Sequence, residues 1–367
     1  MQTQHLTAGF IGLGLIGGSI ARALKKQAPS TTVMAYMRSR DRLLKAQEDG
    51  AVDIILEGVG EPLRQCDIIF LCTPVEYNAS YLEQIRPYLK PGAVITDVGS
   101  TKTQIHEAVQ SLAMEESFIG GHPMAGSEKT GYENSTDHLL ENAYYILTPT
   151  DKTPESSVAM MTQTASLIGA IPLVLDYREH DRIVAAVSHL PHIIASSLVN
   201  LVKDSDSPEG IMRRVAAGGF KDITRIASCS PEMWEQICMT NAGPIGDMLE
   251  QYIGSLQDIL DQIRGHKDKE IYRLFEKSRT YRDSITDRAK GPIEPSYEFS
   301  VDVVDEVGSI STIAVILAAK GISIKNIGIN NNREHGEGAL KIAFYDEASM
   351  KEAWERLEKY KFELVRL

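Results

Sequence analysis

The chain has 367 residues, 43% of them hydrophobic and 24% charged, which is typical of a soluble globular protein with two or three domains. Its formal net charge of −12 argues against general binding to nucleic acid, because nothing offsets the repulsion from phosphates over the whole molecule. The four cysteines are scattered without a CxxC pair, which argues against a disulfide scaffold and a metal site and favours a reducing cytoplasm.

Residues 8–23 are apolar enough to be confused with a signal peptide, but no basic segment precedes them and glycines interrupt them. No stretch elsewhere reaches the length of an uninterrupted membrane span. We therefore expect no membrane partner and a cytoplasmic location.

From residue 8 to about residue 176, apolar strands alternate with amphipathic helices, which indicates a parallel sheet with crossover helices. The expected strands cover residues 8–12, 33–37, 67–72, 93–98, 118–121, 144–147 and 171–175. Helices are expected over residues 17–26, 80–89, 104–113 and 155–168. The sequence therefore predicts an α/β fold over residues 1–176, with a doubly wound, Rossmann-like parallel sheet.

Beyond Tyr177 the strand signals disappear, and helical spacing continues over residues 179–203, 209–227, 232–264 and 267–285. Pro191 and Pro244 fall inside these runs and are expected to kink or break them. This predicts an all-helical second domain over residues 177–285, whose Met- and Leu-rich faces form a core or the seam of a homodimer.

Residues 286–296, TDRAKGPIEPS, contain two prolines and a glycine and are expected to form a linker. A strand, helix, strand, strand, helix, strand pattern follows over residues 297–304, 309–320, 325–330, 339–345, 349–360 and 362–366, with a turn at 333–338. The sequence predicts a small third domain of the ferredoxin-like βαββαβ kind over residues 297–367.

The segment GFIGLGLIGGS, residues 9–19, has GxGxxG spacing directly after the first expected strand and at the start of a helix. Glycine permits a tight turn and lets backbone N–H groups approach a pyrophosphate at the positive end of the helix. We expect this loop to bind a dinucleotide through Gly12, Leu13, Gly14, Leu15, Ile16 and Gly17.

The second expected strand ends in Met37, Arg38, Ser39 and Arg40. An NAD-binding domain usually has an acidic residue at this position for the ribose 2′-hydroxyl, whereas cations here favour the 2′-phosphate of NADP. Alternatively, Arg38 stacks on the adenine ring and NAD binds. The sequence leaves both cofactors open.

Two further segments, LCTPVEY and TDVGSTK, lie where parallel strands end, the edge at which open α/β sheets bind ligands. They place Thr73, Pro74 and Ser100 near the cofactor or the substrate. Ser100 is also a candidate N-cap of the following helix, and the two roles are compatible.

His122 follows the expected strand 118–121 in FIGGHPMAGSEKTG. A histidine in a core is a hydrogen-bonded filler, but one at this edge, between Gly121 and Pro123 and beside a dinucleotide, is placed to move protons.

Two segments of the helical region add candidates. In SHLPH, His189 and His192 are spaced i,i+3 and share a helix face, and in GGFKDITRIA, Lys221 and Arg225 are spaced i,i+4. Packing explains the histidines equally well, and a solvated surface explains the two cations.

Taken in order, GLGLIGGS, CTPV, DVGSTK, GGHPMAGSEKTG, SHLPH and FKDITRIA resemble the prephenate and arogenate dehydrogenases of tyrosine biosynthesis. The resemblance covers nearly the whole chain. It implies oxidative decarboxylation: a hydride leaves C4 of a cyclohexadienyl ring for NAD(P)+, the C4 hydroxyl loses its proton, and the C1 carboxylate departs as carbon dioxide.

The resemblance also implies roles for single residues. His122 is the base at the substrate hydroxyl, and Ser100 hydrogen-bonds that hydroxyl or orients the imidazole. Arg225 holds the ring carboxylate, with added charge from Lys221, and His189 and His192 line the side-chain end of the pocket.

The terminal unit resembles an ACT domain through DEVGSISTIAVILAAKGISIKNIGI, although Val307 occupies a position where that family usually has proline. In dehydrogenases of this kind, such a domain implies feedback by an amino acid, L-tyrosine.

Three alternatives remain. A dehydrogenase of the β-hydroxyacid type would use Lys221 as its acid and base, and would leave the His122 motif unexplained. A metabolite sensor without catalysis would have no need of Ser100, His122 and Arg225. Within the resembling family, His192 disfavours the ammonium group of arogenate, so prephenate is the expected substrate and arogenate the alternative.

Overall fold

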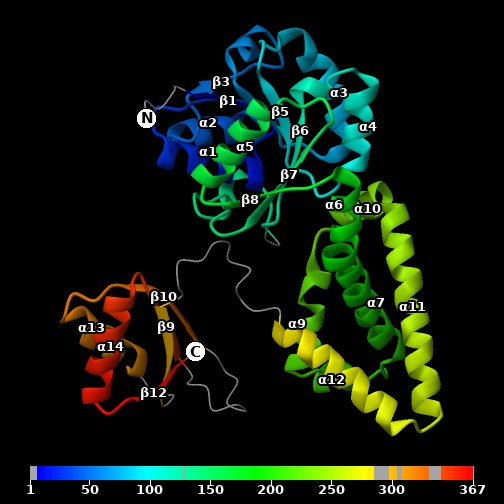
Figure 1. Cartoon of the computed structure of the whole chain (residues 1–367), viewed down its shortest axis with the longest axis vertical. Helices are drawn as coiled ribbons and strands as arrows, with labels where there is room; N and C mark the ends of the chain where they lie inside the picture. The colour runs from blue at the N-terminus through cyan, green and yellow to red at the C-terminus, as the bar shows by residue number, and fades with distance from the viewer. Residues whose placement is uncertain (1–5, 127–128, 285–296, 304–307, 330–339, 367) are drawn as a thin grey trace. The chain divides into compact units, whose positions relative to one another are not determined.

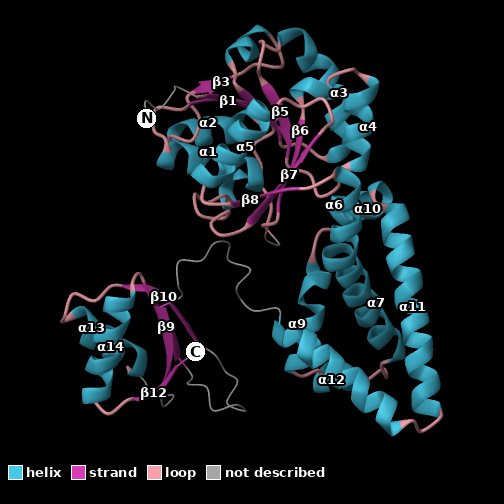
Figure 2. Ribbon diagram, in the orientation of Figure 1, coloured by secondary structure: helices cyan, strands magenta, loops and turns pink. Residues whose placement is uncertain are grey.

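The computed structural model describes residues 6–126, 129–284, 297–303, 308–329 and 340–366 (Figure 1). The chain divides into two compact units, Met1–Thr286 and Asp287–Leu367. The first unit holds an α/β part and a helical part, and the second holds a small sheet with two helices (Figure 2).

A five-stranded parallel sheet in the order β3-β2-β1-β4-β5 forms the centre of the α/β part. Its strands are β1 (Thr7–Ile11), β2 (Thr32–Tyr36), β3 (Ile54–Ile55), β4 (Ile68–Leu71) and β5 (Val94–Asp97). Strands β1, β4 and β5 are buried along their full length. Buried parallel strands are expected to be almost entirely apolar, which is why they were recognisable in the sequence.

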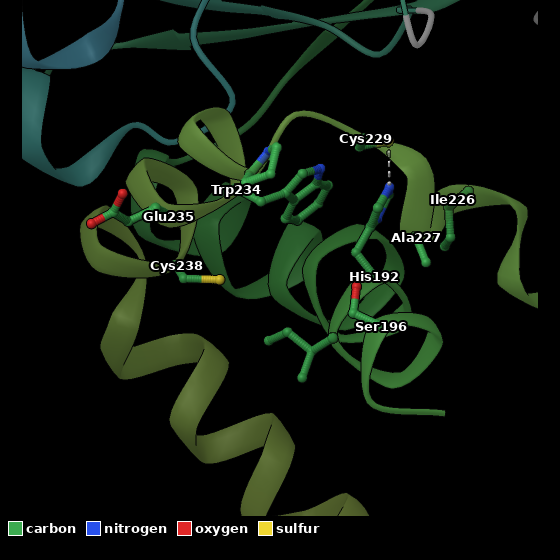
Figure 3. Close-up of a pocket in the computed structure, with 10 residues that line it drawn as sticks. His192, Ser196, Ile226, Ala227, Cys229, Trp234, Glu235 and Cys238 are labelled. Carbon is green, nitrogen blue, oxygen red and sulfur yellow. Dashed lines mark hydrogen bonds between the residues drawn. The ribbon is translucent and has the colours of Figure 1, made fainter. Parts of the chain in front are cut away.

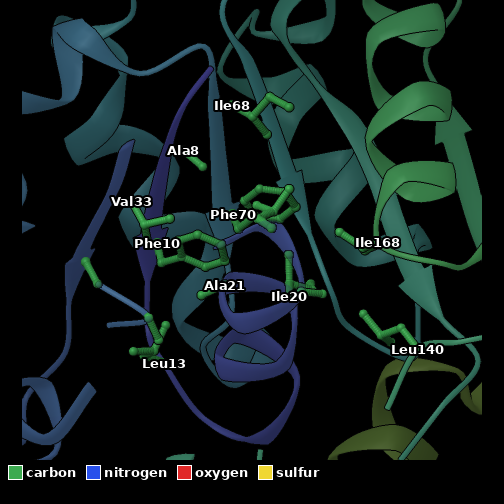
Figure 4. Close-up of a cluster of buried hydrophobic side chains, with 14 of the residues drawn as sticks. Ala8, Phe10, Leu13, Ile20, Ala21, Val33, Ile68, Phe70, Leu140 and Ile168 are labelled. Carbon is green, nitrogen blue, oxygen red and sulfur yellow. The ribbon is translucent and has the colours of Figure 1, made fainter. Parts of the chain in front are cut away.

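Successive residues of these strands point into two separate cores, one on each face of the sheet. One core contains Phe10, whose ring stacks on Phe70 at a centroid distance of 4.8 Å (Figure 4). It is covered by α1 (Leu15–Gln27), α2 (Arg40–Glu48) and α5 (Glu155–Leu167). The other core is covered by α3 (Val75–Ile85) and α4 (Thr103–Ser111). The predicted doubly wound arrangement is therefore confirmed for these five strands.

The remaining strands correct the prediction of one parallel sheet. Strands β6 (Ile119–Pro123), β7 (Tyr144–Pro149) and β8 (Ile171–Val174) form a second sheet, in which β6 runs antiparallel to β7. A parallel pair needs a crossover connection, usually a helix. Helix α5 provides it between β7 and β8, whereas the described residues between β6 and β7 contain only the short 3₁₀ turn Tyr132–Asn134.

The helical part is more broken than predicted. It comprises α6 (Tyr177–Val184), a π-helical turn Ala185–His189, α7 (Leu190–Ser205), α8 (Ile211–Val215), α9 (Gly218–Thr224), a 3₁₀ turn Arg225–Ser228, α10 (Pro231–Thr240), α11 (Ala242–Arg264) and α12 (Asp268–Ser284). Pro191 follows the π-helical turn, whose wider backbone accommodates the missing proline N–H. Pro244 lies in the first turn of α11, where proline is tolerated, and the break falls instead at Asn241.

By length and composition alone, the helical stretch Tyr177–Ser205 could cross a membrane, so the expectation that no stretch reaches that length is wrong. Core helices of soluble proteins meet the same criterion. In this unit the stretch carries the buried residues His180, Asp181 and His189, which form hydrogen bonds with the α/β part and with Asn241, between α10 and α11.

The second unit has the predicted βαββαβ order: β9 (Tyr297–Asp302), α13 (Ser309–Ala318), β10 (Ile324–Ile329), β11 (Leu340–Phe344), α14 (Glu347–Lys359) and β12 (Glu363–Arg366). Its sheet has the order β10-β11-β9-β12, and every neighbouring pair is antiparallel. Phe299 and Phe344 stack in its core at a centroid distance of 5.3 Å. The predicted linker 286–296, the turn 333–338 and Val307 lie outside the described residues.

Candidate active site

The glycine loop after β1 has the backbone that a dinucleotide requires. Gly12 has φ +88°, and a Cβ atom there would lie 2.7 Å from the carbonyl oxygen of Cys72, so only glycine fits this turn. Gly14 is different, because a Cβ atom there would meet no atom within 4 Å. The protein has space for a side chain at Gly14, and this space opens into the cavity that Gly14 lines.

Helix α1 begins at this loop, with Gly14 as its N-cap residue and no acidic side chain in its first turn. Leu15, Ile16 and Gly17 line the same cavity. The N–H groups of a first helical turn have no partner within the helix, and the helix dipole favours an anion there. The loop therefore fits a dinucleotide pyrophosphate. Leu13 does not line the cavity, because its side chain is buried in the core beneath.

The cavity has a volume of about 680 Å³ and lies between the α/β part and the helical part. From the α/β part it is lined by Gly14, Leu15, Ile16, Gly17, Cys72, Thr73, Pro74, Val98, Ser100, His122, Pro123, Met124, Ala125, Gly126, Lys129, Thr130 and Gly131. From the helical part it is lined by Ser188, His189, His192, Ile226, Cys229, Ser230, Met233, Trp234 and Ile237. None of these described residues is an aspartate or glutamate.

The two cations after β2 have different partners. Arg40 forms an ion pair with Glu57 at 2.7 Å, whereas the guanidinium of Arg38 lies over the ring of Tyr77, 5.6 Å from its centroid. Ser39 is the N-cap residue of α2, but its side chain makes no capping hydrogen bond. Arg38 and Ser39 do not line the 680 Å³ cavity, so any contact with a cofactor falls at its adenosine end.

Thr73, Pro74 and Ser100 line the cavity as expected from their positions after β4 and β5. The hydroxyl of Thr73 donates to Oδ1 of Asn78 at 2.9 Å, which fixes its orientation. Ser100 is not the N-cap residue of the next helix, which begins at Thr103 with Lys102 as its N-cap. The capping role suggested for Ser100 is wrong, because the chain runs two residues further before the helix begins.

His122 lies within strand β6 rather than after it, which corrects the predicted boundary. The neighbouring Gly121 packs directly against β5, since a Cβ atom there would lie 2.5 Å from the carbonyl oxygen of Asp97. His122 is 8% exposed and lines the cavity. Burial, together with His180, Lys102 and His189, holds the pKa of His122 well below its ordinary value, so the ring is neutral at neutral pH.

His180 and Asp181, which the sequence reasoning did not single out, stand behind His122. Nδ1 of His122 lies 2.8 Å from Nε2 of His180, and Nδ1 of His180 lies 2.8 Å from Oδ1 of Asp181. Asp176 caps α6 by accepting hydrogen bonds from the N–H groups of Arg178 and Glu179, which places His180 in the first turn. An adjacent His-Asp pair at a helix start was the available signal, but nothing in the sequence connects it to His122.

Asp181 is held by the start of α4. Its carboxylate accepts hydrogen bonds from the backbone N–H groups of Lys102 and Thr103, at 2.8 Å each, and from the Thr103 hydroxyl at 2.6 Å. Burial opposes ionisation, but the hydrogen bonds from His180 and Thr103 outweigh it and lower the pKa of Asp181. Asp181 is therefore a buried carboxylate.

His189 and His192 both reach the cavity, as their spacing predicted. Nδ1 of His189 lies 3.1 Å from the amide nitrogen of Asn241, and burial lowers the pKa of His189 to about 4. His192 stacks on Trp234 at a centroid distance of 3.7 Å, and its Nδ1 donates to the Ser188 carbonyl at 2.9 Å. Burial and the charge of Arg225 lower the pKa of His192. Trp234 was missed because a lone tryptophan in a helix is usually a core residue.

Lys221 and Arg225 are exposed, and neither lines the cavity. The single helical face predicted for them is also wrong, because α9 ends at Thr224 and Arg225 begins a 3₁₀ turn. Arg225 is nevertheless close enough to affect the pKa of His192, and the next residue, Ile226, lines the cavity.

A second pocket of about 430 Å³ adjoins the cavity and shares His192, Ile226, Cys229 and Trp234 with it (Figure 3). Its other lining residues include Ser196, Glu235 and Cys238. Nε2 of His192 lies 3.8 Å from Sγ of Cys229. The stacked His192 and Trp234 therefore stand between two pockets.

Sequence models of known families match most of the first unit. Residues 20–172 match the model described as prephenate dehydrogenase, nucleotide-binding domain, and residues 176–277 match the model described as prephenate dehydrogenase, dimerization domain.

Individual proteins are also similar to this chain over most of its length. The prephenate dehydrogenase of Bacillus subtilis is 38% identical over 349 residues, covering 95% of this chain and 94% of the relative. A crystal structure of prephenate dehydrogenase from A. aeolicus, in complex with hydroxyphenyl propionate and NAD+, superposes with a TM-score of 0.73 at 28% identity, covering 78% of this chain and 100% of that one. Synechocystis arogenate dehydrogenase superposes with a TM-score of 0.69 at 30% identity, covering 76% and 99%.

Proposed function

The chain belongs to the prephenate dehydrogenase family and shares its activity as a nicotinamide-dependent oxidoreductase, and we propose that His122 is the general base of this reaction. Prephenate would be converted to 4-hydroxyphenylpyruvate in the cavity between the α/β and helical parts. The observation that carries the proposal is a neutral, nearly buried histidine that lines the cavity and is backed by a second histidine and a carboxylate.

The bound dinucleotide supplies the hydride acceptor at C4 of the substrate ring. The protein must supply a base for the C4 hydroxyl and cations for two carboxylates, and it must hold the ring in position. His122 takes the hydroxyl proton, and Ser100, on the neighbouring β5–α4 connection, hydrogen-bonds the same hydroxyl. Loss of carbon dioxide makes the ring aromatic and drives the reaction forward.

The dinucleotide would lie along the loop from Gly14 to Gly17 and past Thr73 and Pro74. The choice between NAD and NADP rests on Arg38 and Ser39. No carboxylate occupies the positions directly after β2, and Arg40 forms an exposed ion pair with Glu57. We propose that Arg38 accommodates a 2′-phosphate, so that NADP+ is accepted as well as NAD+.

The anionic side of the substrate would face the helical part. Arg225, at the residue preceding Ile226, is proposed to hold the ring carboxylate, with Lys221 adding positive potential. His189, His192 and Trp234 would contact the side chain. The proposal requires the Arg225 side chain to reach past Ile226 when substrate binds, which is consistent with its influence on His192.

Prephenate is favoured over arogenate because the two differ only in a keto or an ammonium group on the side chain. None of the described residues that line the 680 Å³ cavity is acidic, and burial lowers the pKa values of His189 and His192, which line that end. An ammonium group would find no counter-charge among them. Equal kcat/KM values for the two substrates would overturn this preference.

The assay follows the near-ultraviolet absorbance of reduced nicotinamide with prephenate, in NAD+ and NADP+ separately, for wild type and His122→Asn. Reduction that is lost in a folded His122→Asn protein supports the assignment of the base. Activity that survives the substitution returns His122 to a structural role. No reduction in either cofactor favours arogenate and then a metabolite sensor, and loss on Lys221→Met alone favours a β-hydroxyacid-type mechanism.

We also propose a cytoplasmic homodimer that is regulated by L-tyrosine through the second unit. The helical part exposes large apolar side chains that a second copy would cover, among them Ile253, Leu256, Leu260 and Ile263 on α11. The βαββαβ order of the second unit supports this proposal. Inhibition of prephenate oxidation by L-tyrosine, lost on removal of residues 287–367, is the expected result.

A further inference from the structure

Three buried side chains from two parts of the first unit form a continuous hydrogen-bonded chain. It runs from His122 in β6 to His180 and Asp181 in α6. We infer that His180 and Asp181 are positioning residues for His122: they fix the tautomer that leaves Nε2 of His122 as the base, and they share the proton that it takes up. The inference rests on the proposed role of His122.

The carboxylate of Asp181 determines which ring nitrogens of His180 and His122 carry protons. Asp181 is ionised and can only accept, so Nδ1 of His180 carries the proton between them. At 2.8 Å, one proton lies between Nε2 of His180 and Nδ1 of His122. When the hydrogen bond to Asp181 uses the ring proton of His180, the proton between the two rings belongs to His122, because the second nitrogen of His180 is then an acceptor. Nε2 of His122 is left with a lone pair, as a general base requires.

The proton transfer balances within this chain. The O–H bond of the substrate hydroxyl breaks and an N–H bond forms at Nε2 of His122, which becomes an imidazolium. Its Nδ1 proton can then move to Nε2 of His180, so that the positive charge rests beside Asp181. When product leaves, the shared proton returns from Nε2 of His180 to Nδ1 of His122, and the proton taken from the substrate leaves Nε2 of His122 for solvent.

The charges around the hydrogen-bonded chain of His122, His180 and Asp181 explain why the Asp181 carboxylate is important. The groups that face His122 are His180 from α6, Lys102 at the start of α4 and His189 from the π-helical turn, and each opposes a positive charge on its ring. Lys102 is itself paired with Asp97. Asp181 is the group in this cluster that stabilises the protonated pair, and three donors from Lys102 and Thr103 prevent it from turning away.

The test compares Asp181→Asn and His180→Gln with His106→Gln. His106 is a matched control: it is also a buried histidine, it shares one hydrogen bond with Thr148 and stacks on Tyr177, and it lies outside the chain of three. Folding is checked by circular dichroism and thermal unfolding. Where Asp181→Asn does not fold, His180→Gln carries the same kinetic test.

For Asp181→Asn and His180→Gln we expect kcat to fall by at least about tenfold with little change in KM, because neither residue touches substrate. Asp181→Asn should also move the acid limb of kcat/KM to lower pH by about one unit, because the protonated pair loses its counter-charge. His106→Gln should lower stability and leave that limb in place. The inference would be overturned if Asp181→Asn and His180→Gln lose activity while the acid limb of the kcat/KM profile of Asp181→Asn stays at the wild-type pH.

A measurement without substrate separates this inference from the proposed activity. Nitrogen-15 NMR of the free protein distinguishes protonated from bare ring nitrogens, with resonances assigned by His122→Asn and His180→Gln. Protonated Nδ1 and bare Nε2 on His122 are expected. The opposite tautomer on His122 would overturn the inference, whereas a wild-type protein that oxidises no cyclohexadienyl substrate would overturn the proposed activity and leave the tautomers as found.

Discussion

The carboxylate of Asp97 accepts a hydrogen bond of 3.1 Å from the backbone N–H of Gly121, which joins the end of β5 to the residue before His122. The same carboxylate accepts a hydrogen bond of 2.9 Å from Gly99 and pairs with Lys102. One buried side chain therefore holds both the connection that carries Ser100 and the strand that carries His122. This sets the spacing of the two groups proposed to contact the substrate hydroxyl.

Replacing Asp97 should destabilise the fold strongly. Asp97→Asn removes the carboxylate that is paired with the buried ammonium of Lys102, which is expected to cost about 3–5 kcal/mol in the free energy of unfolding. Urea denaturation measures the change. Glu57→Gln, which breaks the exposed pair with Arg40, is the control and should have no measurable effect. Equal changes in the two variants would contradict the structural role assigned to Asp97.

Gly14→Ala should affect cofactor binding and leave stability unchanged. The new Cβ atom meets nothing in the protein but lies where a pyrophosphate would approach the backbone. We expect the KM for the dinucleotide to rise by at least about tenfold, equivalent to about 1.4 kcal/mol, at an unchanged melting temperature. Gly12→Ala is the contrasting variant, because its positive φ and its contact with Cys72 should lower the melting temperature. An unaltered cofactor KM in Gly14→Ala would argue against this loop as the binding site.

Arg38 should decide between the two cofactors. Arg38→Ala is expected to lower kcat/KM with NADP+ by about tenfold or more, and to change the value with NAD+ much less, because only NADP+ has a 2′-phosphate for the guanidinium. Arg40→Gln is the control, since the charge of Arg40 is already paired with Glu57. Equal losses with both cofactors would show instead that Arg38 stacks on adenine.

Stability should fall in mildly acidic solution. Burial lowers the folded-state pKa of both His106 and His189 from 6.5 to about 4. Between these values the unfolded chain binds protons that the folded chain does not, so the free energy of unfolding decreases as pH falls from 6.5 towards about 4. The expected slope is on the order of 1 kcal/mol per pH unit for each histidine. Urea denaturation across this range measures it, and His106→Gln should flatten the slope. Parallel slopes for variant and wild type would contradict the assignment.

Sequence patterns were sufficient where local structure decides the outcome. The glycine loop, the buried strands of the first sheet and the βαββαβ order of the second unit all follow from short-range periodicity and turn residues. Helix α2 was missed because only Leu43 and Ala46 of its residues are buried, so its apolar stripe is too sparse to recognise.

Long-range packing decided the rest. Strand β6 is antiparallel to β7, and the described part of the connection between them contains no crossover helix. The short apolar run of β6 does not indicate the direction of the strand. His180 meets His122, 58 residues away along the chain, only because α6 packs against α4 and against β7, the strand next to β6. Such a contact has no local signature, and so the two residues behind the predicted base could not be found from motifs.

The stripe on α11 should hold the proposed dimer together. Ile253, Leu256, Leu260 and Ile263 are 37–57% exposed and recur at helical spacing along one side of α11, in the region that matches a dimerization domain. Charges placed in such a stripe would have to be desolvated on association. Ile253→Glu combined with Leu260→Glu should therefore convert a dimer to a monomer in light scattering at micromolar concentration. Gln251→Glu, an exposed polar position on the same helix, is the control and should remain dimeric. A wild-type protein that is already monomeric would exclude the dimer, and a double variant that stays dimeric would move the interface to another face of the helical part.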